Sequence, residues 1–153
     1  MSLKSSWRLS TWRLIMSDFR GLYSIRPLDP ADKNLILATF LRGLYYGDSW
    51  FSMIPKDIFM SNYSKIAEGL LNSPNVLVNV ACLPEDPNVI LGYSIVSADY
   101  LTVHYVYVKS AWRKKGIAKA LTPMHPNYVS HLTELGKSLL HKLPNTTFNP
   151  FAL

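Results

Sequence analysis

The sequence lacks the features of a disulfide-stapled, membrane-spanning or repeat protein. It has one cysteine, Cys82, so no internal disulfide can form. No apolar run approaches the 18 or so residues that a membrane-spanning helix requires, and there is no internal repeat or low-complexity tract. Because Cys82 lies in the apolar stretch VLVNVAC, we expect a buried thiol in a reducing compartment, hence a cytoplasmic protein.

The composition is that of a globular protein. The chain has 153 residues, of which 48% are hydrophobic and 17% charged, which suits one domain around a substantial core. Residues 1–16 contain three basic residues and no acid. We therefore interpret residues 1–20 as a basic extension, and residues 21–153 as the single folded domain. A transit peptide or a membrane-surface helix are the alternatives for the extension.

Acidic residues are missing from a second stretch, between Asp99 and Glu134. Five basic residues of a chain with net charge +6 crowd into eleven positions there: Lys109, Arg113, Lys114, Lys115 and Lys119. Such a cluster indicates a local anion site rather than the broad basic face typical of nucleic-acid binders.

The apolar periodicity predicts the order β-α-α-β-β-β-α-β-α-β, which indicates an α+β domain with a central mixed sheet flanked by helices. Asp29 and Pro30 should begin the first helix, and the second should present Ile58, Phe59, Tyr63, Ile66, Leu70 and Leu71 inward. An aromatic loop, GDSWFSMIP, joins the two helices. The first expected strand lies in LYSIRPLD (22–29) and is ended by Pro27. The others are 76–82, 89–96, 101–108, 128–133 and a last extended piece at 145–151, and the later helices end near 121 and 143.

The basic turn follows the expected strand 101–108 and opens a short helix. Together with the strand at 128–133 these segments form a parallel βαβ unit, and ligands bind open sheets at the carboxyl ends of such strands. Backbone N–H groups at a glycine-containing turn suit a phosphate or pyrophosphate, which Gly116 would let approach closely. The spacing of the glycines matches neither a Walker A loop nor the dinucleotide-binding fingerprint. A plain solvated turn is the alternative reading.

The pattern Arg113-x-x-Gly116-x-Ala118 resembles the acyl-coenzyme-A site of the GNAT acyltransferase superfamily, and the expected element order follows that family over about residues 22–151. The resemblance implies transfer of an acetyl group from acetyl-coenzyme A to an amine acceptor, a small molecule or a protein, by direct attack and without a metal. It implies that the donor is held by the end of strand 101–108 and the basic turn: Val106, Tyr107, Val108, Arg113, Lys114, Lys115, Gly116, Ile117 and Ala118.

The sequence departs from the family pattern in three places. Thr122-Pro123 shortens the helix after the signature. The strand lacks the glutamate that many members use as a base, and the nearest candidates are Asp99 and His104. Histidine suits that role near neutral pH, although a hydrogen-bonded histidine within the sheet is the alternative.

No tyrosine stands on the final helix, where the family often places the group that returns a proton to the thiolate. Tyr128 and His131 are the local candidates, together with Ser130 and Ser138. For His131, capping of the next helix beside Thr133 is the alternative role.

The acceptor should enter near the aromatic loop, where Tyr46, Asp48, Trp50 and Phe51 could shape a lid and Asp48 could bind an amine. Trp50 and Phe51 as ordinary core anchors are the alternative. Two other functions stay open: a non-catalytic coenzyme-A-binding or partner-binding module of the same fold, and a nucleic-acid-binding or nucleic-acid-modifying protein that uses residues 109–119 on phosphates.

Overall fold

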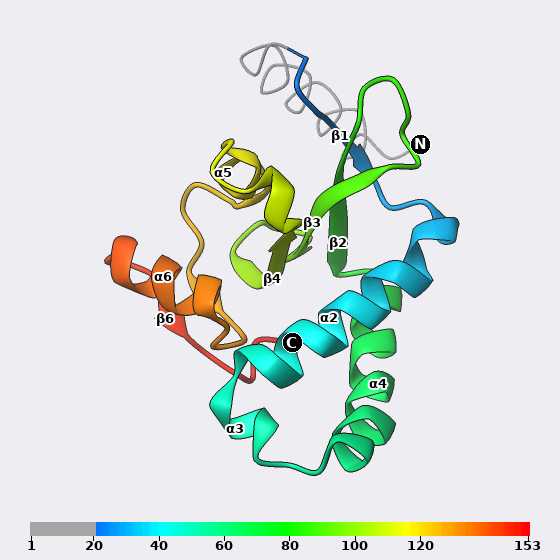
Figure 1. Ribbon diagram of the computed structural model, residues 1–153. Helices are drawn as coiled ribbons and strands as arrows, with labels where there is room; N and C mark the ends of the chain where they lie inside the picture. Colours follow the sequence, from blue (N-terminus) through cyan, green and yellow to red (C-terminus); the bar gives the residue numbers. More distant parts are fainter. Residues whose placement is uncertain (1–20) are drawn as a thin grey trace.

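The computed structural model describes residues 21–153, and the expected extension at residues 1–20 lies outside them. Six strands form one sheet in the order of the sequence (Figure 1). The strands are β1 Ser24–Pro27, β2 Val76–Cys82, β3 Ile90–Ser97, β4 Thr102–Val108, β5 Tyr128–Val129 and β6 Thr147–Phe148. β1 to β4 pair antiparallel, whereas β4 with β5 and β5 with β6 pair parallel.

Helices cover both faces of this sheet, which confirms the predicted α+β architecture (Figure 1). The two long helices, α2 (Lys33–Gly47) and α4 (Lys56–Asn72), pack on one face. The short helix α5 (Ile117–Leu121) lies on the other face, where α6 (Glu134–Lys142) also contributes a side chain. Three shorter helical segments are the 3-10 helices η1 (Pro30–Asp32) and η2 (Ser110–Trp112) and the helix α3 (Ser49–Ser52).

Each face of the sheet has its own apolar core. The core under α2 and α4 is aromatic and includes Phe40, Phe59, Tyr93 and Tyr105. The core under α5 is mainly aliphatic, and its buried side chains include Leu91, Val103, Val106, Ile117 and Leu121. Alternation along β4 sends neighbouring side chains into different cores, which lets one strand serve both faces.

The chain enters α2 through the cap that the sequence predicts. Asp29 Oδ1 accepts a hydrogen bond from the N–H of Ala31, and Pro30 begins η1. Asp32 then accepts two hydrogen bonds from the Arg26 guanidinium, at 2.6 and 3.0 Å. This bidentate hydrogen bonding lowers the pKa of Asp32 and joins the end of β1 to the start of α2.

Two sequence predictions about packing need correction. Ile58 and Ile66, expected inward, are 51% and 45% exposed, because only one side of α4 meets the sheet and Ala67 takes a buried place instead. The expected strand at 128–133 pairs only over Tyr128–Val129, because the side chains of Ser130 and His131 bond inward and the backbone turns toward α6.

The aromatic loop between the two long helices contains a short helix that the sequence pattern does not predict. Asp48 accepts a hydrogen bond from the N–H of Trp50 and caps α3. Among the described residues, no helix has the length and apolar character needed to cross a membrane.

Candidate functional site

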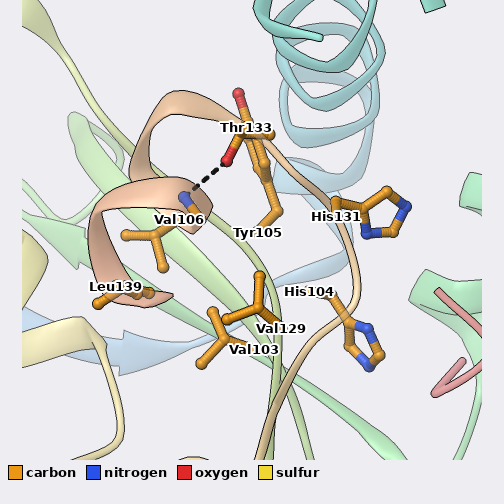
Figure 2. Close-up of a pocket in the computed structure, with 9 residues that line it drawn as sticks. Val103, His104, Tyr105, Val106, Val129, His131, Thr133 and Leu139 are labelled. Atoms are coloured by element: carbon orange, nitrogen blue, oxygen red, sulfur yellow. Dashed lines mark hydrogen bonds between the residues drawn. The ribbon is translucent and has the colours of Figure 1, made fainter. Parts of the chain in front are cut away.

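β4 and β5 run side by side for two residues and then separate. Their register joins Thr102 to Tyr128 and Val103 to Val129, and the last bond runs from the N–H of Ser130 to the carbonyl of Val103 at 3.1 Å. Beyond that point lies a cavity of about 10 Å³, enough for roughly one water molecule. Figure 2 shows the residues from β4, β5 and α6 that line it.

This separation leaves one edge of β4 without a partner strand. The N–H of Lys109 donates to the carbonyl of Leu91, which fixes the phase of the antiparallel β3–β4 ladder. Because bonded residues alternate in such a ladder, the backbone N–H and C=O groups of Val106 and Val108 point away from β3. These groups face the region between β4 and the segment that follows β5, where the two strands are no longer paired.

The basic turn lies directly beyond this edge. Arg113 Nε donates to the carbonyl of Val108 at 3.1 Å, so the arginine is attached to the end of the strand. Lys115 lies over the ring of Trp112, with Nζ 5.2 Å from the ring centroid. The turn is exposed, and its backbone turns left-handed at Lys114 (φ 64°) and Gly116 (φ 83°).

The backbone donors of this turn are available for a ligand. The N–H groups of residues 116–118 donate to no backbone carbonyl in the part of the chain that the structure describes. The buried side chains of Ile117 and Leu121 hold α5 on the sheet, and α5 ends at Leu121 as the sequence predicts. The result is a cluster of exposed cations and free N–H groups at the carboxyl end of β4, which suits an anion.

A β-bulge turns His104 out of the regular alternation. Tyr105 faces Ile95 and Val103 faces Val96, so His104 is the extra residue of β4. Figure 2 shows the imidazole rings of His104 and His131 pointing to one side, away from Val103, Val106 and Val129. That side is the aromatic core under α2, where the His131 ring meets the edge of Phe40.

Four polar side chains form a hydrogen-bonded chain at this place. His104 Nδ1 lies 2.8 Å from Ser130 Oγ, which lies 2.8 Å from His131 Nδ1. His131 Nε2 is hydrogen bonded to the hydroxyl of Tyr63 on α4. His104, Ser130 and His131 are 3%, 3% and 6% exposed, so these three members of the hydrogen-bonded chain are almost entirely shielded from water.

Burial controls the protonation of this chain. Desolvation, reinforced for His104 by the neighbouring His131, lowers the pKa of each histidine to about 4. Burial also raises the pKa of Tyr63 to about 12, and the negative charge of Asp48 adds to that effect. All three groups are therefore neutral near pH 7.

The structure brings together only some of the residues that the sequence predicts to be catalytic. His104 and His131 come together, joined by Ser130. Tyr128 lies at the exposed start of β5, is 40% exposed and takes no part in the hydrogen-bonded chain. Asp99 caps the turn before β4 through Ser97 and Leu101. Tyr63, the residue that sequence reasoning missed as a functional candidate, gave only one signal: a tyrosine on the predicted inward face of its helix.

The four predicted acceptor-binding residues also fall into two groups, one near Tyr63 and one on the surface. Phe51 is half-buried and packs against Phe59 and Tyr63, and Asp48 is close enough to influence the pKa of Tyr63 and His131. Tyr46 and Trp50 are 62% and 67% exposed, and the Tyr46 hydroxyl accepts a hydrogen bond from Lys56. Over residues 21–153, no group of three or more acidic, histidine or cysteine side chains is arranged to hold a metal ion.

Comparisons with known proteins show which solved structures have a similar fold. No protein-family model and no curated protein matches the sequence. Among solved structures, a Pyrococcus furiosus protein provisionally described as an acetyl transferase superimposes with a TM-score of 0.54 and 16% identity, over 83% of this chain and 81% of that one.

Two further structures overlap less well. A GCN5-related N-acetyltransferase from Rhodopseudomonas palustris matches with a TM-score of 0.46 and 16% identity, over 65% of this chain and 61% of that one. A ribosomal-protein-alanine N-acetyltransferase from Brucella melitensis matches with a TM-score of 0.42 and 18% identity, over 82% and 76%. The order of strands and helices, together with the first of these superpositions, shows that this chain has the fold of the GNAT acetyltransferases.

Proposed function

We propose that this protein transfers an acetyl group from acetyl-coenzyme A to an amine by direct attack of the amine on the thioester. The observation that carries the proposal is the backbone edge of β4 at Val106 and Val108, which has no partner strand and ends at an exposed basic turn. Among the described residues, only the Val108 carbonyl of this edge is bonded to a side chain, that of Arg113. A pantetheine arm is an extended chain of amides, and a free strand edge offers it backbone donors and acceptors.

The phosphate end of the donor fits the turn. Arg113 and Lys115 supply positive charge, and the free N–H groups of residues 116–118 supply directional donors. Gly116 has no Cβ and adopts φ 83°, so the backbone can curve around an anion without strain. The signature residue Ala118 is half-buried and leaves the second turn uncluttered.

The reacting end fits the place where β4 and β5 separate. Acetyl-coenzyme A would supply the acyl group there as a thioester. The backbone N–H of Val106 points into that space and would polarise the thioester carbonyl. The cavity now has room for about one water molecule, so the arm requires the β5–α6 side to give way.

The acceptor amine would approach from the opposite face, between α2, α4 and the sheet. Asp48 would attract an ammonium group, and the half-buried Phe51 and Tyr63 would shape the entrance. His104, at the bulge where the strands part, would accept the proton from the attacking amine. Because this mechanism forms no covalent enzyme intermediate, no nucleophilic side chain is required.

Calorimetric titration of acetyl-coenzyme A tests the proposal. We expect micromolar binding to the wild type and at least tenfold weaker binding to an Arg113→Ala/Lys115→Ala double variant, because two charge-assisted contacts are lost. The matched control is Lys65→Ala/Lys142→Ala, which removes two exposed charges outside the turn and should bind like the wild type.

The outcomes separate the proposal from its rivals. Binding without acetylation across a panel of primary amines would indicate a non-catalytic coenzyme-A-binding module. No binding to a folded wild type would overturn the acyltransferase proposal. Salt-dependent binding of DNA or RNA, lost in the Arg113→Ala/Lys115→Ala variant, would then favour a nucleic-acid ligand.

A further inference from the structure

The hydrogen-bonded chain of His104, Ser130, His131 and Tyr63 connects β4, the turn after β5 and α4 through the interior. We propose that this chain is a proton relay, in which His104 exchanges a proton with the reacting groups while Tyr63 exchanges one with the acceptor entrance. The inference rests on the proposed acetyl transfer and assigns to this site two positioning residues, Ser130 and His131, and a proton exit.

The geometry at Ser130 couples the two histidines. Its hydroxyl lies 2.8 Å from Nδ1 of both imidazoles and has one proton to donate. With both histidines neutral, the hydroxyl donates to one Nδ1 and accepts an N–H from the other. The two rings therefore hold opposite tautomers, so that a change in one requires a change in the other.

Tyr63 extends this coupling by one bond. In the first arrangement, His104 Nδ1–H donates to Ser130, Ser130 donates to His131 Nδ1, and His131 Nε2–H donates to the tyrosine oxygen. In the second arrangement every bond is reversed: Tyr63 donates to His131 Nε2, His131 Nδ1–H donates to Ser130, and Ser130 donates to His104 Nδ1. The protein carries the same number of protons in both.

One proton entering at His104 Nε2 converts the first arrangement into the second. The proton on His104 Nδ1 moves to Ser130, that of Ser130 moves to His131, and that of His131 Nε2 moves to Tyr63, whose original hydroxyl proton leaves. The attacking nitrogen thus loses a proton as the new C–N bond forms, while the electrons of the broken C–S bond remain on sulfur. His104 Nε2–H then protonates the thiolate, as a proton re-enters at Tyr63 and restores the first arrangement.

Burial explains why such a relay would be needed. His104 and His131 are nearly inaccessible to water, and desolvation lowers the pKa of each to about 4, which makes a buried imidazolium costly. A concerted shift moves a proton without forming that cation. Of the four side chains, only that of Tyr63 is half-buried rather than buried, and it lies beside Phe51 and near the Asp48 carboxylate. The proton would therefore leave the protein from the Tyr63 hydroxyl.

Nitrogen-15 NMR of the imidazole rings in the whole protein tests the coupling directly. Tyr63→Phe removes the last member of the chain, which does not bond His104. We expect the ratio of His104 tautomers to change at least twofold in Tyr63→Phe, and we expect Ser130→Ala to abolish that response. Tyr45→Phe is the matched control, because it deletes a half-buried tyrosine hydroxyl that donates to the carbonyl of Ile54 and takes no part in the hydrogen-bonded chain.

Kinetics with acetyl-coenzyme A and a panel of primary amines, from benzylamine to spermidine, test the use of the relay. We expect Ser130→Ala to lower kcat about 100-fold with an unchanged dissociation constant for acetyl-coenzyme A, while Tyr45→Phe keeps the wild-type kcat.

A His104 tautomer ratio that ignores Tyr63→Phe would overturn the relay even in an active enzyme. Wild-type kcat in Ser130→Ala would also overturn it. Failure of the wild type to bind acetyl-coenzyme A would reject the proposed function and the relay's catalytic role with it, while the NMR response would still show whether the four side chains are coupled.

Discussion

The free energy of unfolding should fall steeply as the pH is lowered from about 6.5 to about 4. The cause is the pair of buried histidines, His104 and His131, each of which has its pKa lowered in the fold from 6.5 to about 4. In the unfolded chain both imidazoles meet water and take up protons near pH 6.5. In the folded protein they remain neutral until the pH is close to 4.

The sign follows from counting protons. Between these two pH values the unfolded state binds more protons than the folded state, so acid favours unfolding. Above pH 6.5 the histidines contribute no slope, and below pH 4 the slope from this pair ends. Lowering the pKa from 6.5 to about 4 corresponds to about 3 kcal/mol for each histidine. The effect of the pair is therefore a large part of the stability of a small domain.

Urea unfolding at a series of pH values measures this slope. His104→Gln and His131→Gln should each reduce it, because glutamine does not titrate, and the double variant should nearly flatten it. His125→Gln, at an exposed position, is the matched control. A wild-type curve that stays level from pH 6.5 to 4.5 would show that the two imidazoles take up protons as readily in the fold as in water.

An acidic group, Asp32, titrates in a lower pH range than the two histidines, which allows the two effects to be separated. The Arg26 guanidinium lowers the pKa of Asp32 below its ordinary value of 3.8. Its contribution to stability is therefore present above about pH 4 and is lost as the pH falls through the folded pKa. Asp32→Asn should change the curve in that lower range and leave the histidine slope between pH 6.5 and 4 in place.

The sequence predicts the central part of the fold well because local patterns determine it. β2, β3 and β4 are runs of apolar and β-branched residues separated by short turns, and their observed bounds lie within one residue of the expected ones. The basic turn could be recognised because its residues are neighbours in the chain. The early end of α5 follows from Pro123, whose ring cannot continue a helix.

The hydrogen-bonded chain could not be predicted because it depends on contacts distant in sequence. Tyr63 and His131 are 68 residues apart, and Ser130 and His104 are 26 apart. The bulge that presents His104 toward the aromatic core leaves no mark in the alternation of TVHYVYV. Ile58 and Ile66 mislead for a related reason, since helical spacing cannot say how much of a helix surface the sheet will cover.

Gly43→Ala should destabilise the protein, although alanine is normally the better helix residue. Gly43 lies in α2 directly over Tyr105, and an added Cβ would overlap the tyrosine hydroxyl and stand 2.8 Å from Cζ. The Tyr105 ring has little room to move, because it packs against Phe40 with centroids 4.9 Å apart and is 7% exposed. We expect a loss of about 1–3 kcal/mol, typical of overpacking.

Gly69 in α4 provides the matched control for this substitution. Nothing lies within 4 Å of a Cβ added there, so Gly69→Ala should stabilise by about 1 kcal/mol through helix propensity alone. Combining Gly43→Ala with Tyr105→Phe, which removes the overlapping hydroxyl, should recover part of the loss, as urea unfolding of the wild type and the three variants would measure. Equal shifts for Gly43→Ala and Gly69→Ala would mean that α2 does not press on Tyr105.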